Sequence, residues 1–502
     1  MIIDNLILGI EAAFTIKNLL YCFYGAVLGT MIGVLPGFGP TAALSILLPF
    51  TIHIGDPLSA LIMMSAIYIA VMYAGSTPAI LTNVPGEITS VVTALDGYAM
   101  TKKGKAGAAL AIASIGSLIA GIIGSILVFL VVEPAAKFAV KFGPVELTSL
   151  CFLSFASSLF LVKKNPLKSV SMFLLGIFLG MIGINPNTAM PRFTMGLDFL
   201  HDGINFAILA VSLFGFVELF YNFFNQNIII KLSKFKLFLI SKSELCRGIP
   251  SSLRGTAIGG FFGLLPGFGH VISPILSYAV EKKISKTPDK FGNGMIEGVA
   301  GPESANNASV QTSFVPMLVL GIPFNSVMSL ILASLVMYDI IPGPLVMDTE
   351  PMLFWGVIVS FLMANIILFL LNYPLVFLWI YFLKVNQKIL IAIISVICLI
   401  GVYKINNNIN DIFFLLLPLT IIGYLLRLLQ FDLTPILLGF IIGPLFEKYF
   451  VRSLFIHNND STIFLSSPIS LICLVVSAAI LYKTFTQEIY DANKSKISKS
   501  KE

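Results

Sequence analysis

Two copies of one short motif have the residue types of an anion-binding helix break. Residues 32–39 read IGVLPGFG and residues 262–269 read FGLLPGFG, at an offset of 263 − 33 = 230 residues. Proline removes a backbone hydrogen bond and glycine allows turns that other residues resist, so each copy should interrupt a helix. The half-helix that follows would begin near Pro40 or His270. Its free N–H groups and its dipole suit a carboxylate.

A second, weaker repeat follows each break, around Pro85 and Pro323, at an offset of 323 − 85 = 238 residues. Many transporters consist of two related halves whose broken helices meet near the middle of the bilayer. The halves are inverted or parallel according to the number of spans between the breaks, and the sequence leaves this number open. We divide the chain into a first membrane repeat with its lead-in helix (1–225), a basic cytoplasmic connecting loop (226–254), a second membrane repeat (255–445), and a terminal helix with a basic tail (446–502).

Polar residues near the two breaks are the candidates for substrate binding. Polar side chains are frequent from Glu297 to Thr312, and no Lys or Arg occurs between residues 291 and 348, although a long solvent loop normally carries some. The alternatives are an ordinary solvent loop here, and glycines and prolines that serve packing alone. Because the helix break occurs twice, we favour a functional role for its glycines and prolines over a role in packing alone. The predicted substrate site consists of Gly37, Gly39, Pro40, Ser76, Thr77, Asn83, Gly267, Gly269, His270, Asn306 and Asn307.

A coupling ion would need oxygen ligands or a titratable carboxyl group close to this site. Hydroxyl oxygens and unwound carbonyls suit Na⁺, whereas proton coupling needs a carboxylate. Glu218 lies in an apolar run, where an acidic group is costly unless it is functional or hydrogen-bonded to a neighbouring helix. We predict that the coupling ion, Na⁺ or H⁺, binds near Thr82, Glu218, Glu303 and Ser309. We expect no other cofactor and no metal centre, because the five cysteines are scattered singly.

The elements that position these residues must be membrane helices. Of the 502 residues, 57% are hydrophobic and 11% are charged, far from the composition of a soluble domain. A helix needs roughly 20 apolar residues to cross a bilayer, and we count about 11 to 13 hydrophobic segments, several of them interrupted. The segments are continuously apolar, so the fold class is all-α and polytopic, not a barrel. No GxxxxGK[ST] phosphate loop occurs, so energy must come from an ion gradient or a partner.

The positive charges of short loops predict the topology. Lys and Arg gather at residues 102–105, 163–168, 231–254 and 282–290, and these loops are the cytoplasmic candidates. The net charge of +6 is largely explained by them. The lysine-rich C-terminus should also be cytoplasmic. The N-terminus has no basic region before its first apolar stretch, so we expect the first helix to be retained.

These residues match a known family. The chain resembles TctA, the large membrane subunit of tripartite tricarboxylate transporters, from about residue 19 to residue 468. The first-half motifs are GVLPGFGP (33–40), YAGS (73–76), NVPGE (83–87), TALDGY (93–98), RFTMG (192–196) and LFGFVE (213–218). The second-half motifs are FG (291–292) with Gly294, EGVAGPESANNA (297–308), LGIP (320–323), PGP (342–344), Pro435 with LG (438–439), and GPLFE (443–447).

The resemblance implies a function and partners. It implies secondary active uptake of a di- or tricarboxylate such as citrate across the bacterial cytoplasmic (inner) membrane, driven by Na⁺ or protons, with a motion like that of an elevator. The expected partners are a small TctB-like membrane subunit, a periplasmic TctC-like solute-binding protein and the lipid bilayer, with no nucleic acid. His270 departs from the family, which usually has a small residue there. Ser467-Pro468 and Asn459-Asp460 also depart from it.

The alternatives to a transporter are a membrane enzyme, a passive channel and a structural membrane module. A polytopic membrane enzyme that acts on a lipid-linked substrate would group Asp, His or Arg side chains at the interface. The four histidines, His53, His201, His270 and His457, lie far apart in the sequence, so we do not expect an enzyme. Flux that does not depend on a gradient would favour a passive anion channel, and no flux at all would favour a structural membrane module.

Overall fold

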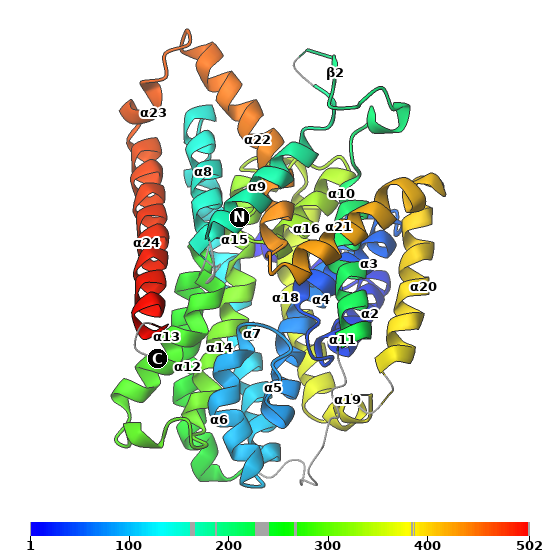
Figure 1. Ribbon diagram of the computed structural model, residues 1–502. Helices are drawn as coiled ribbons and strands as arrows, with labels where there is room; N and C mark the ends of the chain where they lie inside the picture. Colours follow the sequence, from blue (N-terminus) through cyan, green and yellow to red (C-terminus); the bar gives the residue numbers. More distant parts are fainter. Residues whose placement is uncertain are drawn as a thin grey trace.

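The computed structural model describes residues 2–160, 166–185, 188–225, 240–265, 269–382, 385 and 387–499, and these form a bundle of helices (Figure 1). Gly267, residues 226–239 of the predicted connecting loop, Lys163, Lys164 and Lys501 lie outside these ranges. The first half contains α1 (Ile2–Ala13), α2 (Ile16–Gly33), α3 (Pro40–Ile52), α4 (Pro57–Ala74), α5 (Ser76–Thr82), α6 (Ser90–Lys102), α7 (Ala106–Ala139), α8 (Pro144–Phe160), α9 (Pro166–Gly180), β1 (Gly183–Ile184), β2 (Pro191–Arg192), η1 (Asp198–Leu200), α10 (Phe206–Ala210), the π-helical η2 (Val211–Phe216) and α11 (Val217–Asn225).

The second half begins with α12 and ends with the longest of the C-terminal helices. It contains α12 (Lys242–Leu264), α13 (Gly269–Ile284), η3 (Pro288–Lys290), α14 (Glu297–Thr312), α15 (Phe314–Leu320), α16 (Ser326–Met337), α17 (Val346–Thr349), α18 (Pro351–Asn372), α19 (Val376–Phe382), α20 (Gln387–Asn406), the π-helical η4 (Asp411–Leu416), α21 (Leu417–Leu428), α22 (Thr434–Ile456), α23 (Ile463–Ser466) and α24 (Pro468–Lys499). The basic tail thus continues α24 as far as Lys499.

The predicted all-α, multi-pass membrane fold is confirmed. Nine helical stretches of the described residues are long and apolar enough to cross a membrane. This number is lower than the predicted 11 to 13 because four more apolar helices, among them α3 and α16, have only 10–17 residues. Helices that stop after 12 or 13 residues reach only part of the way across a bilayer.

Two predicted boundaries fall inside helices. Residues 242–254 of the predicted connecting loop form the start of α12, where Ser241 and Glu244 make a reciprocal capping box. This Ser-x-x-Glu pattern begins helices because it satisfies two free backbone N–H groups. The positive charges of the segment had indicated a loop instead. The predicted end of the second repeat at residue 445 lies inside α22, which continues to Ile456.

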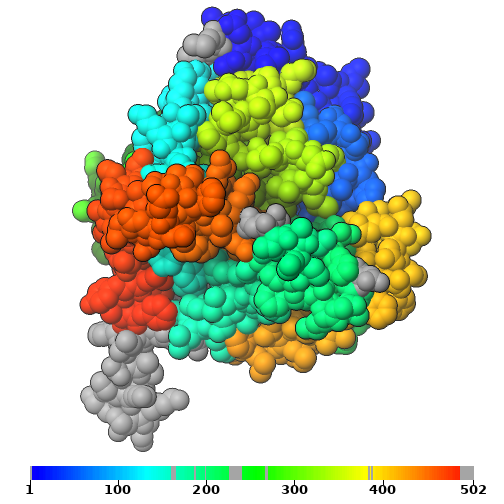
Figure 2. All heavy atoms as spheres, turned by 90° about the horizontal axis from the view of Figure 1, so that it is seen from above, coloured from blue at the N-terminus to red at the C-terminus, as the bar shows by residue number. Residues whose placement is uncertain are grey.

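Helix α14 packs against α12, α7, α13 and α6. The long helix α7 also contacts α18, and α18 packs on α1, α2 and α4. Seen from above, the chain near residue 350 lies between the N-terminal helices and the C-terminal ones (Figure 2). The contacts with α12, α7, α13 and α6 enclose α14, and its residues from Gly298 to Thr312 are buried.

Glycine stripes let two pairs of helices approach closely. Along α2, a Cβ at Gly29 would lie 2.7 Å from the carbonyl oxygen of Ile67 on α4. Along α12, a Cβ at Gly259 would lie 2.1 Å from the carbonyl oxygen of Ala305 on α14. The stripes, Gly25, Gly29 and Gly33 on α2 and Gly255, Gly259 and Gly263 on α12, again differ by 230 residues. Small residues at this spacing are typical of membrane helix packing.

Each half contains a second break with the same local form. Helix α4 ends at Ala74 and α14 at Thr312, an offset of 312 − 74 = 238 residues. The short helices that follow, α5 and α15, have seven residues each. They end at Asn83 (φ 60°) and Gly321 (φ 66°), both left-handed and again 238 residues apart. The weaker sequence repeat therefore corresponds to one local chain path that occurs twice.

Candidate functional site

The polar run of the second half is a buried helix. All residues from Gly298 to Thr312 on α14 are buried, so the alternative of a solvent loop is wrong. A helix with polar side chains on several faces is unusual in a protein interior, where polar groups need partners. The side chains concerned are Glu303, Ser304, Asn306, Asn307, Ser309, Gln311 and Thr312.

Glu303 is fully buried. It is hydrogen-bonded to α6 directly and to α7 through Asn307. Its carboxylate accepts hydrogen bonds from Thr93 Oγ1 on α6 (3.1 Å) and from Asn307 Nδ2 (3.3 Å). Asn307 Nδ2 also donates to Ser117 Oγ on α7 (2.8 Å). Positions 303 and 307 are four residues apart and therefore share one face of α14. Ser76, at the start of α5, lies next to the Glu303 carboxyl group.

Glu87 is a site residue that the sequence interpretation missed. It lies between α5 and α6, is 8% exposed, and accepts hydrogen bonds from the hydroxyls of Thr89 and Ser90. Asn306 Nδ2 on α14 donates to the same carboxylate (3.0 Å). A signal was present, because Glu87 comes two residues after Pro85 in a stretch without any Lys or Arg from residue 18 to residue 101.

The two carboxyl groups have no positive partner among the residues that the structure describes. Among the described residues, no Lys, Arg or His makes a hydrogen bond or ion pair with Glu87 or Glu303. A buried carboxylate without a counter-charge costs several kcal/mol. The side-chain oxygens of Asn306 and Asn307 are also buried without a partner in the described part of the chain. This oxygen-rich cluster has the chemistry to hold a proton or a small cation.

Other predicted residues of the first half lie near the second break of that half. Ser76 and Thr77 are buried at the start of α5, and Ser76 Oγ donates to the Tyr73 carbonyl oxygen (3.0 Å). Thr82 Oγ1 donates to Pro78 O (2.7 Å), and Asn83 ends α5. In α14, Ser309 Oγ donates to Asn306 O (2.8 Å).

The first sequence break is formed as predicted. Helix α2 ends at Gly33 and α3 begins at Pro40, with Gly39 as its N-cap. Gly37 has a φ of 87°, which favours glycine at this position. Close to the start of α3, Thr41 Oγ1 lies 2.8 Å from Ser326 Oγ, the first residue of α16. The first break thus reaches a helix start of the second half.

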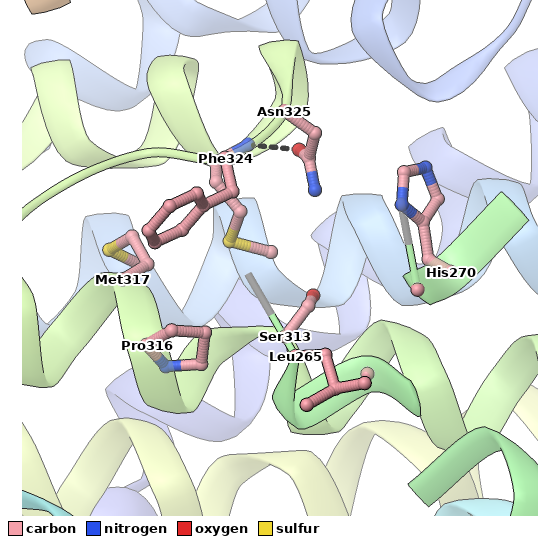
Figure 3. A pocket seen from close by; sticks show the side chains of 10 residues that line it. Leu265, His270, Ser313, Pro316, Met317, Phe324 and Asn325 are labelled. Carbon is pink, nitrogen blue, oxygen red and sulfur yellow. Dashed lines mark hydrogen bonds between the residues drawn. The ribbon is translucent and has the colours of Figure 1, made fainter. Parts of the chain in front are cut away.

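The second sequence break borders a small cavity. Helix α12 ends at Leu264, and α13 begins at Gly269, next to the predicted His270. The cavity holds about 10 Å³, and its lining includes His270, Ser313, Phe324 and Asn325 (Figure 3). This volume suffices for one water molecule or one ligand atom of similar size.

Glu218 lies in a different environment. It forms an ion pair with Arg427 on α21 and accepts a hydrogen bond from Asn222 Nδ2 (3.1 Å). The Arg427 guanidinium also lies over the ring of Tyr221, 3.9 Å from its centroid. The structure therefore gives Glu218 a partner on a neighbouring helix and does not place it with Glu87 and Glu303.

Asp96, which was not predicted as a site residue, fixes the start of α14. Its buried carboxylate accepts hydrogen bonds from the backbone N–H groups of Gly292 (3.0 Å), Gly294 (2.6 Å) and Met295 (2.7 Å). Tyr278 Oη on α13 donates to it as well (2.9 Å). Because α14 begins directly after this loop, Asp96 joins α6 to the helix that carries Glu303.

Comparisons with known proteins agree with this architecture. The family model described as "Tripartite tricarboxylate transporter TctA family" matches residues 19–438. An uncharacterized 52.8 kDa protein in the TAR-I ttuC' 3' region of Agrobacterium vitis is 43% identical over 479 residues, which cover 95% of each chain. An uncharacterized protein in the TAR-II ttuC' 3' region of the same organism is 44% identical over 226 residues, 44% of this chain and 93% of that protein. No solved structure matches the chain. The chain therefore belongs to the tripartite tricarboxylate transporter TctA family.

Proposed function

We propose that this chain is the large permease subunit of a binding-protein-dependent transporter that takes up a small di- or tricarboxylate, such as citrate, with Na⁺ or H⁺. The bacterial cytoplasmic membrane is its proposed location, with the C-terminus on the cytoplasmic side. Its proposed partners are a small TctB-like membrane subunit and a periplasmic TctC-like solute-binding protein. Family membership supports the transporter assignment.

One observation supports ion coupling: Glu87 and Glu303 are buried, bonded to neighbouring residues of α14, and without a positive partner among the described residues. Two negative charges there would repel an anionic substrate. At a separation of about 5 Å and an effective dielectric constant of about 20, each pair of like charges costs about 3 kcal/mol. Each bound proton or Na⁺ neutralises one of the two charges and so weakens this repulsion, which would make anion and cation bind together and cross together.

We also propose that the halves are inverted repeats. The end of α3 contacts the end of α16, because Tyr338 Oη donates to Thr51 O (2.7 Å) and Ile52 O (3.0 Å). The end of α6 contacts the chain that follows α13, because Lys103 Nζ donates to Asn293 O (2.5 Å).

In the repeat, α3 corresponds to α13 and α6 to α16. Figure 1 places α3 and α16 in the upper part of the bundle, and α6 and α13 in the lower part. Corresponding half-helices thus point to opposite ends, which supports inversion and a substrate site at the level where the breaks meet.

The test is uptake into proteoliposomes that hold the chain, its small subunit and its binding protein. A panel of radiolabelled di- and tricarboxylates is offered under an imposed Na⁺ or proton gradient. We expect gradient-dependent uptake that is lost in an Asn306→Ala, Asn307→Ala double variant. If no carboxylate moves under either gradient while the complex is intact, the substrate class is wrong. Flux that does not depend on either gradient would instead favour a passive channel.

A further inference from the structure

The repeat offset places two different side chains at one structural position. Glu87 and Asn325 both follow the short helix after the second break of their half, and 325 − 87 = 238. Gly75 corresponds in the same way to Ser313, since 313 − 75 = 238. One half therefore has a carboxylate where the other half has an amide.

The first-half position is closed by backbone. Gly86 N donates to Gly75 O (3.2 Å), and a Cβ at Gly86 would lie 2.8 Å from Gly33 O. Glu87 itself is turned to Thr89, Ser90 and Asn306. This position leaves no room for a ligand beside Gly86, and its charge would repel an anion.

The second-half position is open and supplies hydrogen-bond donors. Asn325 is 6% exposed, and its Oδ1 accepts from Met328 N (2.8 Å) as the N-cap of α16. The cap fixes the orientation of the amide, so Nδ2 points into the cavity between His270 and Ser313 (Figure 3). In the described part of the chain, neither Nδ2 of Asn325 nor the ring of His270 has a hydrogen-bond partner.

Two helices longer than the seven-residue helices α5 and α15 also begin at this cavity. His270 is the second residue of α13, which has 16 residues, and Asn325 caps α16, which has 12. Their dipoles add partial positive charge, and no Asp or Glu lines the cavity among the described residues. The lining of this space of about 10 Å³ is mostly apolar, with the amide of Asn325 and the ring of His270 among its few polar groups. Such a site suits one oxygen atom of an anion better than a cation, which needs acceptor oxygens.

We propose that this cavity binds one carboxylate group of the transported anion, with Asn325 Nδ2 as its principal donor and His270 beside it. The two breaks then have different tasks, because the equivalent first-half position, with Glu87, belongs to the cation-binding cluster. This proposal rests on the proposed function and deepens it. It also implies that the affinity of the membrane subunit for carboxylates depends on the second half of the chain.

The test uses a variant that preserves the cap. Asn325→Asp keeps an acceptor for Met328 N, since Asp and Asn are equally good N-caps, but it replaces the cavity donor with a negative oxygen. The matched control is Asn205→Asp, because Asn205 caps α10 in the same way, through Ala207 N (2.9 Å). Asn325→Ser, which keeps a shorter capping hydroxyl, serves if the Asp variant cannot be purified.

The measurement is thermal unfolding of the purified complex of chain and small subunit, without the binding protein, against carboxylate concentration. A ligand that binds the folded state raises the unfolding temperature. We expect the half-saturating concentration to rise about tenfold or more in Asn325→Asp or Asn325→Ser and to stay within about twofold of wild type in Asn205→Asp.

The outcomes separate this inference from the proposed function. Equal half-saturating concentrations in wild type and the Asn325 variants overturn the cavity proposal. So does a wild-type complex that no carboxylate stabilises although the full system transports it. If the full wild-type system transports no carboxylate, the proposed function fails, and this inference fails with it.

Discussion

Asn306 Nδ2 lies 3.0 Å from the Glu87 carboxylate, although 219 residues separate the two in the chain. The next residue, Asn307, bonds to Glu303. Neighbouring amides on α14 thus hold two carboxyl groups, one from each half of the chain. Glu303 also accepts a hydrogen bond from Thr93 on α6. A shift of α14 relative to α6 would therefore change the Asn306–Glu87 and Thr93–Glu303 bonds together, which links the charge state of this cluster to the relative position of the two helices.

Neutral replacements should uncouple transport from its gradient. Glu303→Gln and Glu87→Gln keep the shape of each side chain but cannot bind a cation by charge or exchange a proton. We expect the ratio of uptake with and without a gradient to fall about tenfold, within the usual range of coupling energies. The check is proteoliposome uptake under Na⁺ and proton gradients.

The control for this experiment is Glu133→Gln, because Glu133 pairs with Lys137 on its own helix (2.7 Å) and lies outside the cluster. It should leave the ratio unchanged. A wild-type ratio in both Glu303→Gln and Glu87→Gln would show that the coupling ion binds elsewhere.

Glu218 should affect stability more than coupling. Its ion pair with Arg427 joins α11 to α21, and removal of one member of a partly buried pair leaves the other charge without a partner. We expect Glu218→Gln to lower the unfolding temperature by a few degrees while the gradient ratio stays at the wild-type value. The swap Glu218→Arg with Arg427→Glu should recover part of the loss. If Glu218→Gln instead has normal stability but its uptake no longer depends on a gradient, Glu218 is a coupling residue.

Local chemistry made the helix breaks predictable. Proline and glycine act on the backbone within a few residues, so the starts of α3 at Pro40 and α13 at Gly269 could be placed from sequence. The glycine stripes on α2 and α12 were also visible at a spacing of four residues, but were not interpreted. The loop predicted at residues 226–254 is wrong from residue 242 onward, because the basic residues there lie on a helix that the capping box at Ser241 begins.

The candidate site was only partly predictable because its pairs join distant segments. The polar character of α14 and the lack of basic residues drew attention to Glu303, Asn306 and Asn307. Glu87 was missed, since its bond to Asn306 depends on how the halves pack. Glu218 was predicted, but its partner Arg427, 209 residues away, was not, because that contact also depends on how the helices pack.

Alanine at Gly259 should weaken the contact between α12 and α14. Its Cβ would lie 2.1 Å from Ala305 O, too close without a shift of one helix, and such overpacking typically costs about 1–3 kcal/mol. The control is Gly124→Ala on α7, whose Cβ would meet Gln311 of the same helix α14 at an ordinary 3.5 Å. Thermal unfolding of the purified complex should show a lower midpoint for Gly259→Ala only. Equal midpoints would contradict the close packing.

Loss of the negative charge at Asp96 should loosen the start of α14. Asp96→Asn replaces one of two acceptor oxygens with an amide, so the backbone N–H groups of Gly292, Gly294 and Met295 lose charge-assisted hydrogen bonds. We expect amide exchange at these residues to become about tenfold faster or more, as local opening becomes easier. Hydrogen–deuterium exchange with mass spectrometry measures this directly.

The control for Asp96 is Asp56→Asn, because Asp56 caps α4 through Leu58 N (3.3 Å), a task that asparagine performs equally well. Exchange near residue 58 should therefore stay close to wild type. Glu303 lies two helical turns after the Asp96 loop, so faster exchange should be accompanied by weaker gradient-driven uptake. If exchange rises while uptake is normal, the position of Glu303 does not depend on the Asp96 contacts, and the packing of α14 against α12, α7 and α13 is enough to hold it.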